Sequence, residues 1–298
     1  MPTRLFKPLH KDILSTGLYS LDLRLGGSIP RGCMIEVFGP ATSGKTSLSG
    51  SIIYQTQQVG GTALLLDVDN SFTSEPVMKD IGIDTKSLIY NVPDNAESAF
   101  ALITKAIRNE VDTVILDDIG YLATKDELAG DIEFNLTQVV NNRIQALASA
   151  LVGTRTSVIV MNQVRIPIPQ SYPGHQTSPG GLLLRTFAHR RIQLSVGGPI
   201  QDSYGRVLGG NVFARVHKKI GYPSFKRVAI SIYKHGFDYA DDMIDLCIDT
   251  GIINKTGGWL ELNGSKYQNS EELKLWLLQN PQDLETIDSK IQKLMNIE

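Results

Sequence analysis

The chain has 298 residues, 42% of them hydrophobic and 20% charged, which is enough to fill the core of one large domain or of a domain with an appendage. A net charge of −2 argues against a protein that coats nucleic acid through bulk positive charge. The two cysteines, Cys33 and Cys247, are too few for a disulfide scaffold, and no apolar run is long enough to span a bilayer. We therefore expect a cytoplasmic protein.

Short apolar runs alternate with helical patterns from about Met34 to Tyr233. This alternation predicts an α/β fold with a mostly parallel central sheet. The expected strands are Met34–Phe38, Ala63–Asp67, Ser87–Val92, Thr113–Asp117 and Ser157–Met161. The expected crossover helices, with apolar residues three and four positions apart, are Lys45–Val59, Ala96–Asn109 and Glu133–Val152.

The pattern changes after Gly180, where Gly-rich connections separate three apolar runs. These runs, Ile192–Val196, Phe213–His217 and Ala229–Tyr233, predict strands joined by hairpins at one edge of the sheet. From about Gly236 a small acidic unit follows, with helical patterns on both sides of GGWLELNG and a last helix near Leu284–Met295. We expect a core domain over residues 1–235, with a short N-terminal segment, and a small α+β domain over 236–298.

Basic residues concentrate between positions 185 and 227, although the total charge is close to zero. This stretch has nine basic residues and a single acid, Asp202. Such a run is more often a solvated surface than a binding site, so by itself it is weak support for nucleic-acid binding.

A phosphate-binding motif follows the first expected strand. The segment Gly39-Pro40-Ala41-Thr42-Ser43-Gly44-Lys45-Thr46 fits G-x-x-x-x-G-K-[ST] at every required position. Glycines let the loop turn its N–H groups toward a phosphate chain, and the helix N-terminus adds a favourable potential. We expect Lys45 to reach the β- and γ-phosphates of a bound nucleotide and the Thr46 hydroxyl to bind Mg²⁺.

Carboxylates end two other apolar strands. VDTVILDD places Asp117 where a magnesium-side carboxylate is needed, with Asp118 as a less favoured substitute. LLLDVDN ends with Asp67 and Asp69, and either could orient the attacking water or simply cap the next turn. The spacing does not decide between these two.

Six segments together resemble the bacterial RecA recombinases. They are STGLYSLDLRLGG, GPATSGKT, ILDD, VMNQVR, TSPGGLLLR and TGGWLELNG, and they cover the chain from about Ser15 to about residue 280. The resemblance implies a P-loop ATPase that uses ATP and Mg²⁺. It also implies self-association into a helical filament on single-stranded DNA, which is paired with homologous duplex DNA.

The resemblance also assigns roles to individual residues. It gives nucleotide binding to the phosphate loop and Ser47, water-mediated magnesium binding to Asp117, and catalytic roles to Asp69 and Gln163, the latter as sensor of the γ-phosphate. It places Tyr233 beside the base of ATP, and His217 and Lys219 across the subunit interface from a neighbour's ATP. It assigns DNA binding to Arg165, Tyr172, Gly180 and Gly181, and puts Gly130 in a second DNA-binding loop.

The segment Val164–Pro179 also indicates a functional loop by its composition. Its sixteen residues contain four prolines and little periodicity, so they suit no core element, and long irregular loops usually carry function. Arg165 can contact DNA phosphates, and Tyr172 can stack on a base.

The chain departs from the family pattern in four ways. About 14 residues precede STGLYS, so we expect no N-terminal helix that docks on a neighbour, although Arg4–Phe6 could form a short docking strand. Asp69 stands where the family has a catalytic glutamate, and His217 replaces the first of two interface lysines. We also expect no long acidic tail. These departures predict slow ATP hydrolysis and leave a second interpretation open, a nucleotide-switched filament that recruits a partner with little strand exchange.

Overall fold

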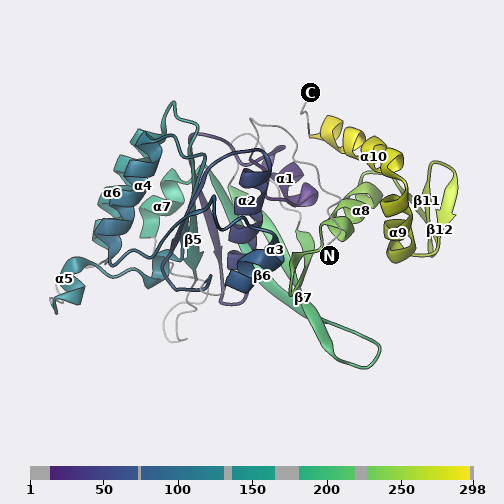
Figure 1. The fold of residues 1–298 in the computed structure, drawn as a ribbon, viewed down its shortest axis with the longest axis horizontal. Coiled ribbons are helices and arrows are strands. Elements are labelled where there is room, and N and C mark those ends of the chain that lie inside the picture. The colour runs from purple at the N-terminus through teal and green to yellow at the C-terminus, as the bar shows by residue number, and fades with distance from the viewer. Residues whose placement is uncertain (1–13, 73–74, 131–135, 165–180, 219–226, 296–298) are drawn as a thin grey trace.

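The computed structural model describes residues 14–72, 75–130, 136–164, 181–218 and 227–295. In this part of the chain, a nine-stranded sheet in the order β3-β2-β4-β5-β1-β6-β7-β8-β9 has helices on both faces (Figure 1). Its strands are β1 Met34–Gly39, β2 Ala63–Asp67, β3 Ile89–Asn91, β4 Thr113–Asp117, β5 Ser157–Gln163, β6 Arg190–Gln201, β7 Val207–Lys218, β8 Val228–Tyr233 and β9 Gly236–Phe237. The predicted α/β fold with a mostly parallel sheet is confirmed.

The parallel strands bring four polar positions to one edge of the sheet. β2 and β4 are buried along their whole length, which is why ALLLD and TVILD read as continuous apolar runs that end in an acid. In the parallel registers Gly39 pairs with Gln163, and Asp67 with Asp117. The phosphate loop, two strand-end carboxylates and Gln163 therefore meet at the carboxyl edge, where open α/β sheets bind ligands.

Two hydrophobic clusters hold helices to the opposite faces of the sheet. The helices on one face are α1 Tyr19–Leu25, α2 Lys45–Gln58 and α3 Glu75–Ile81, and those on the other are α4 Ala96–Arg108, α6 Leu136–Leu151 and α7 Gly181–Phe187. α4 begins after Asn95, whose side chain accepts a hydrogen bond from the Ser98 amide, and buries Ala99, Phe100 and Ile103 on one face. Short helical segments also lie at Ile119–Tyr121 and at α5 Lys125–Leu128.

The antiparallel edge of the sheet is longer than predicted. β6 and β7 form a hairpin that extends beyond the body of the protein (Figure 1). The predicted strands Ile192–Val196 and Phe213–His217 are its inner part. Its outer part is exposed, with Tyr204 near the turn at 84%, so it buries no face and lacks the alternation that marks a strand.

The C-terminal region forms a third hydrophobic cluster, which also includes Tyr19 of α1. Its elements are α8 Tyr239–Asp249, β10 Asn254–Thr256, β11 Trp259–Leu262, β12 Ser265–Tyr267, α9 Ser270–Gln279 and α10 Pro281–Leu294. The three strands form a separate antiparallel sheet, so the expected α+β unit is present. β9 still pairs with β8 of the large sheet, and the division at residue 235 stays a prediction.

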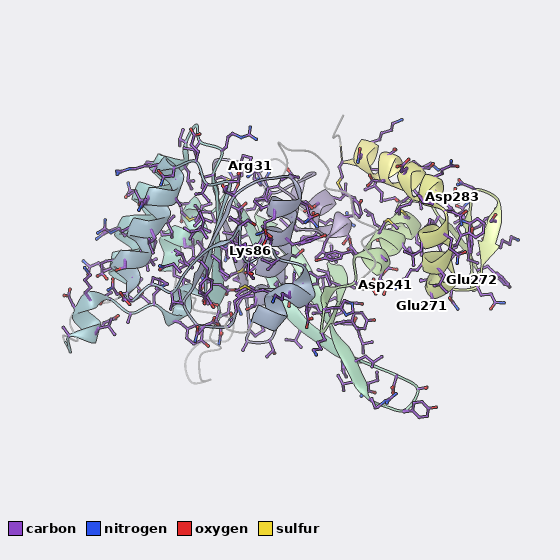
Figure 2. The ribbon with its side chains drawn as sticks, in the orientation of Figure 1. Arg31, Lys86, Asp241, Glu271, Glu272 and Asp283 are labelled. Atoms are coloured by element: carbon purple, nitrogen blue, oxygen red, sulfur yellow. The ribbon has the colours of Figure 1, made fainter. Side chains whose placement is uncertain are left out.

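One lysine links the C-terminal helices by ion pairs. Asp241 on α8 and Glu271 on α9 lie close together (Figure 2), and Lys274 Nζ lies 2.7 Å and 3.1 Å from their carboxylates. These contacts raise the pKa of Lys274, against the effect of burial. Among the helices in the described part of the chain, none has the length and apolar character needed to cross a membrane.

Candidate nucleotide-binding site

The phosphate loop connects β1 to α2 and requires glycine at two positions. Gly44 has a φ of +86°, and a Cβ there would lie 2.6 Å from Ile232 Cδ1. A Cβ at Gly39 would clash with the carbonyl of Leu194. The loop ends at Lys45, the first residue of a 14-residue helix. The first N–H groups of such a helix have no partner within it, so this end favours an anion.

A cavity of about 650 Å³ opens at this loop. It is lined by Ala41, Thr42, Gly44, Lys45, Thr46, Ser47, Asp69, Asp117, Asp118, Tyr121, Gln163, the β6 segment 196–199, the β7 segment 209–212 and Ile232. Its volume falls within the range of small-molecule sites. The structure therefore brings the phosphate loop together with Asp69, Asp117 and Gln163.

Lys45 is the cationic side chain that lines this cavity. Its Nζ donates hydrogen bonds to the carbonyl oxygens of Gly39, at 3.3 Å, and Pro40, at 3.0 Å. The same Nζ lies 4.0 Å from Asp118 Oδ2. The buried ammonium is therefore held at the base of the loop, where a phosphate chain would meet it.

The carboxylates of the LLLDVDN segment have different environments. Asp67 is buried and accepts hydrogen bonds from the amides of Ser71 and Phe72 and from the Tyr90 hydroxyl, so it fixes the turn after β2. Asp69 is half-buried and lines the cavity, while one of its oxygens accepts the Ser71 amide. Of these two carboxylates, only Asp69 is placed to meet a nucleotide.

Asp117 and Asp118 are both 1% exposed at the end of β4. Burial and the charge of Asp118 raise the pKa of Asp117 to about 7, while a hydrogen bond from Ser49 opposes this rise. Burial raises the pKa of Asp118 as well, against hydrogen bonds from two backbone amides. Two buried carboxylates on adjacent residues would be stabilised by a bound cation.

Asp118 lines the cavity beside Asp117, although the sequence indicated it only as a less favoured substitute for Asp117. Its Oδ1 accepts the amides of Gly120, at 2.8 Å, and Gln163, at 3.1 Å. Its Oδ2 is buried and accepts no hydrogen bond from the described residues. The repeated acid in VILDD was the available signal, but residue type alone could not show that both carboxylates face the same space.

A glycine-rich wall of the cavity was also missed. Gly197 and Gly198 on β6, and Gly209 and Gly210 on β7, line the cavity together with the strand-end carboxylates. A Cβ at Gly197 would lie 2.7 Å from the Asn211 carbonyl oxygen, so larger residues do not fit there. Glycine doublets within two strands are unusual and gave a sequence signal that we interpreted only as connections.

Several predicted residues lie outside the lining of the cavity. Tyr233 stacks on His235 with the ring centroids 5.6 Å apart, and only its neighbour Ile232 reaches the cavity. His217 is exposed and bonds to Gln193 at 2.6 Å. Gly181 begins α7 against α6. Lys219, Arg165, Tyr172, Gly180 and the segment Arg4–Phe6 lie outside the described residues.

The donor set fits a nucleotide with a hard divalent cation. The Thr46 hydroxyl and the Asp117 carboxylate are oxygen ligands of the kind that Mg²⁺ prefers, and Lys45 with the N-terminus of α2 suits the phosphates. The unpartnered Asp118 oxygen adds negative charge that a cation would offset.

The sequence profile of the RecA N-terminal domain matches residues 6–238, which is most of the chain. The chain belongs to the RecA family. Its relatives include the RecA proteins of Cytophaga hutchinsonii, 31% identical over 96% of this chain and 82% of that protein, and of Bacteroides thetaiotaomicron, 31% identical over 96% and 88%.

A crystal structure of the RadB recombinase has a similar fold, with a TM-score of 0.59, 21% identity, and coverage of 76% of this chain and 98% of that one. The resemblance to the RecA family and the fold class are thus confirmed.

Proposed function

We propose that this protein is a recombinase that binds ATP, assembles on single-stranded DNA and pairs it with homologous duplex DNA. One observation carries the proposal. Gln163, at the end of β5, lines the nucleotide cavity, and the chain continues directly from it into the 165–180 segment with its arginine, tyrosine and prolines. A nucleotide sensor is therefore continuous with the expected DNA-binding segment.

Five side chains of the cavity have a proposed part in ATP hydrolysis. Lys45 and the N-terminal amides of α2 would hold the phosphates, and Thr46, directly, and Asp117, through water, would hold Mg²⁺. A cation held there would supply positive charge to offset charge that develops on the phosphates. Asp69 orients the attacking water, and Gln163 responds to the γ-phosphate.

The proposed DNA contacts would give the protein affinity for single-stranded DNA of any sequence. Arg165 contacts backbone phosphates, Tyr172 stacks on a base, and Gly180 and Gly181 close the segment. We expect Arg165→Ala to weaken binding of all single-stranded sequences about equally and to lower the salt slope by about one. Loss of affinity for one sequence alone would contradict this assignment.

The subunit interface supplies the remaining contacts. His217 and Lys219 meet the ATP of the neighbouring subunit, and Tyr233 lies beside the base. In the structure His217 is exposed near the end of β7, which leaves it available to a second copy of the chain.

Electron microscopy with and without single-stranded DNA, each with ATP and with a non-hydrolysable analogue, tests the proposal. We expect filaments that require both DNA and nucleotide, with DNA-stimulated ATP hydrolysis and strand exchange. Nucleotide-dependent filaments that form equally well without DNA, and that exchange no strands, would instead support a nucleotide-switched assembly protein. That result would overturn the recombinase proposal.

A further inference from the structure

The backbone at the exit of β5 is bonded to two of the three groups that face the phosphate-loop lysine, Asp118 and the Gly39 carbonyl; the third is the Pro40 carbonyl. The Gln163 amide donates to Asp118 Oδ1 at 3.1 Å, and the Val164 amide donates to the Gly39 carbonyl oxygen at 3.1 Å. The same Gly39 oxygen accepts a hydrogen bond from Lys45 Nζ at 3.3 Å, and Asp118 Oδ2 lies 4.0 Å from that nitrogen. The consecutive amides of Gln163 and Val164 are therefore each connected to the Lys45 ammonium through one intervening group.

A phosphate chain would compete for this ammonium. Lysine has three donor protons, and the carbonyl oxygens of Gly39 and Pro40 take two of them. Asp118 Oδ2 is buried and has no hydrogen-bond donor among the described residues, so the field of Lys45 is its nearest compensation. When the lysine turns to a phosphate, the Gly39 carbonyl oxygen and Asp118 Oδ2 both lose part of their stabilisation.

The weaker interaction of Lys45 with these two acceptors affects the backbone amides that are bonded to them. Asp118 is rigidly held through Oδ1, so a change at Oδ2 acts on the amide of Gln163. Gly39 likewise shares its oxygen between Lys45 and the amide of Val164, the last described residue before the 165–180 segment. A path of polar contacts therefore runs from Lys45, where phosphates would bind, to the main chain of Gln163 and Val164, separately from the Gln163 side chain.

We propose that Asp118 is a positioning residue that couples nucleotide binding at Lys45 to DNA binding by the segment after Val164. The inference rests on the proposed function, because it requires that segment to bind DNA. By linkage, DNA must tighten nucleotide binding by the same factor as nucleotide tightens DNA binding. Asp118 also opposes nucleotide binding, since its Oδ2 lies 4.0 Å from Lys45 Nζ and would compete with a phosphate chain for that ammonium.

Asp118→Asn distinguishes the hydrogen bonds that this side chain accepts from the charge that it presents to Lys45. Asparagine keeps an acceptor oxygen for the amides of Gly120 and Gln163 but replaces the charged oxygen that faces Lys45 by an amide group. The matched control is Asp242→Asn, which also removes a buried carboxylate, on α8, outside the lining of the cavity. The measurement is the dissociation constant of a fluorescent non-hydrolysable ATP analogue, with and without saturating oligo(dT).

For the parent and for Asp242→Asn we expect DNA to tighten nucleotide binding by about tenfold, within the usual range of coupling between sites. For Asp118→Asn we expect nucleotide binding without DNA to tighten by about tenfold and the effect of DNA to fall to about threefold, because the Gly39–Val164 link and the Gln163 side chain remain. A protein with damaged structure would instead bind nucleotide more weakly.

The outcomes distinguish this inference from the proposed function. If Asp118→Asn keeps the parent's coupling factor, or binds nucleotide more weakly while Asp242→Asn does not, the role of Asp118 is overturned and the recombinase proposal stands. If the parent itself shows no effect of DNA on nucleotide binding, the proposed function fails and the coupling role fails with it.

Discussion

Two of the regions with buried carboxylates, the junction of α1 with the C-terminal unit and the nucleotide cavity, differ in the surroundings of those groups. At the junction of α1 with the C-terminal unit, Asp22 accepts the Ser15 hydroxyl on one oxygen and the Thr16 amide and hydroxyl on the other. Asp242 likewise accepts the Ser20 hydroxyl and amide. In the nucleotide cavity, by contrast, Asp118 keeps one buried oxygen without a hydrogen bond from the described residues.

The difference separates structure from function. Burial raises the pKa of Asp22, Asp242 and Asp117 to about 7, so a raised pKa does not tell the two regions apart. Hydrogen-bond satisfaction does, because native proteins pair nearly all buried polar atoms and an exception needs an explanation. At the junction the carboxylates fix chain segments, whereas the cavity keeps capacity for a ligand.

Removal of the cavity's cation should have the largest effect. Lys45→Ala leaves two buried carboxylates without their nearest positive charge and offers the phosphates no replacement. We expect ATP affinity to fall at least about a thousandfold, or about 4 kcal/mol, and nucleotide-dependent DNA binding to be lost. Equilibrium binding of ATP measures this.

The control for this variant is Lys86→Ala, a change at an exposed lysine (Figure 2). It should bind ATP like the parent. Undiminished ATP affinity in Lys45→Ala would remove the phosphate-loop interpretation.

Asp69 is expected to give the next largest effect, on the rate of hydrolysis. Its side chain is one methylene shorter than glutamate, so with an unchanged backbone its carboxylate would stand roughly 1.5 Å further from the water that we expect it to orient. A displacement on the order of 1 Å can slow a reaction about a hundredfold, or about 2.7 kcal/mol. Single-turnover hydrolysis on saturating single-stranded DNA should be faster for Asp69→Glu and slower for Asp69→Asn, with ATP affinity little changed.

Asp67→Asn is the comparison for this series, because Asp67 lies at the same strand end but holds the turn rather than lining the cavity. Its effect should appear in thermal stability. If Asp69→Glu is no faster and Asp69→Asn no slower than the parent, Asp69 is not the group that orients water.

The fold and the phosphate loop were predictable from the sequence because each has a local signal. Buried parallel strands give continuous apolar runs, and the loop motif has fixed spacing. Asp69 and Gln163 were located through the family resemblance, since their proximity depends on strand order that periodicity does not contain. The presence of Asp118 and of the glycine doublets Gly197–Gly198 and Gly209–Gly210 in the cavity lining depends on which face of a strand meets the cavity, and no local pattern encodes that.

The junction carboxylate Asp242 should make stability respond to pH in the opposite sense to an acid whose pKa is lowered by folding. Its pKa of about 7 lies above the unfolded value of 3.8, so its contribution to stability is complete below pH 3.8 and is lost as the pH rises through 7. Between pH 5.5 and 7 this one group lowers the free energy of unfolding by about 2 kcal/mol. Asp242→Asn should flatten that decline in denaturant unfolding, and an unchanged pH dependence would contradict the assignment.

The smallest expected effect concerns His217, which the cavity itself does not include. Partial desolvation and then the charges of Arg215 and Arg191 lower the pKa of His217 below 6.5, although Glu36 opposes them. If the neighbour's ATP meets this side chain, protonation adds a favourable charge at the interface. The stability of ATP filaments should therefore increase mainly as the pH falls below 6.5.

His217→Lys filaments should be as stable at every pH as the parent's filaments are at low pH, because lysine stays charged. His217→Gln filaments should be as unstable at every pH as the parent's filaments are at high pH, because glutamine stays neutral. Filament sedimentation across this pH range measures the effect, and three parallel profiles would show that His217 does not contact the nucleotide of a neighbouring subunit.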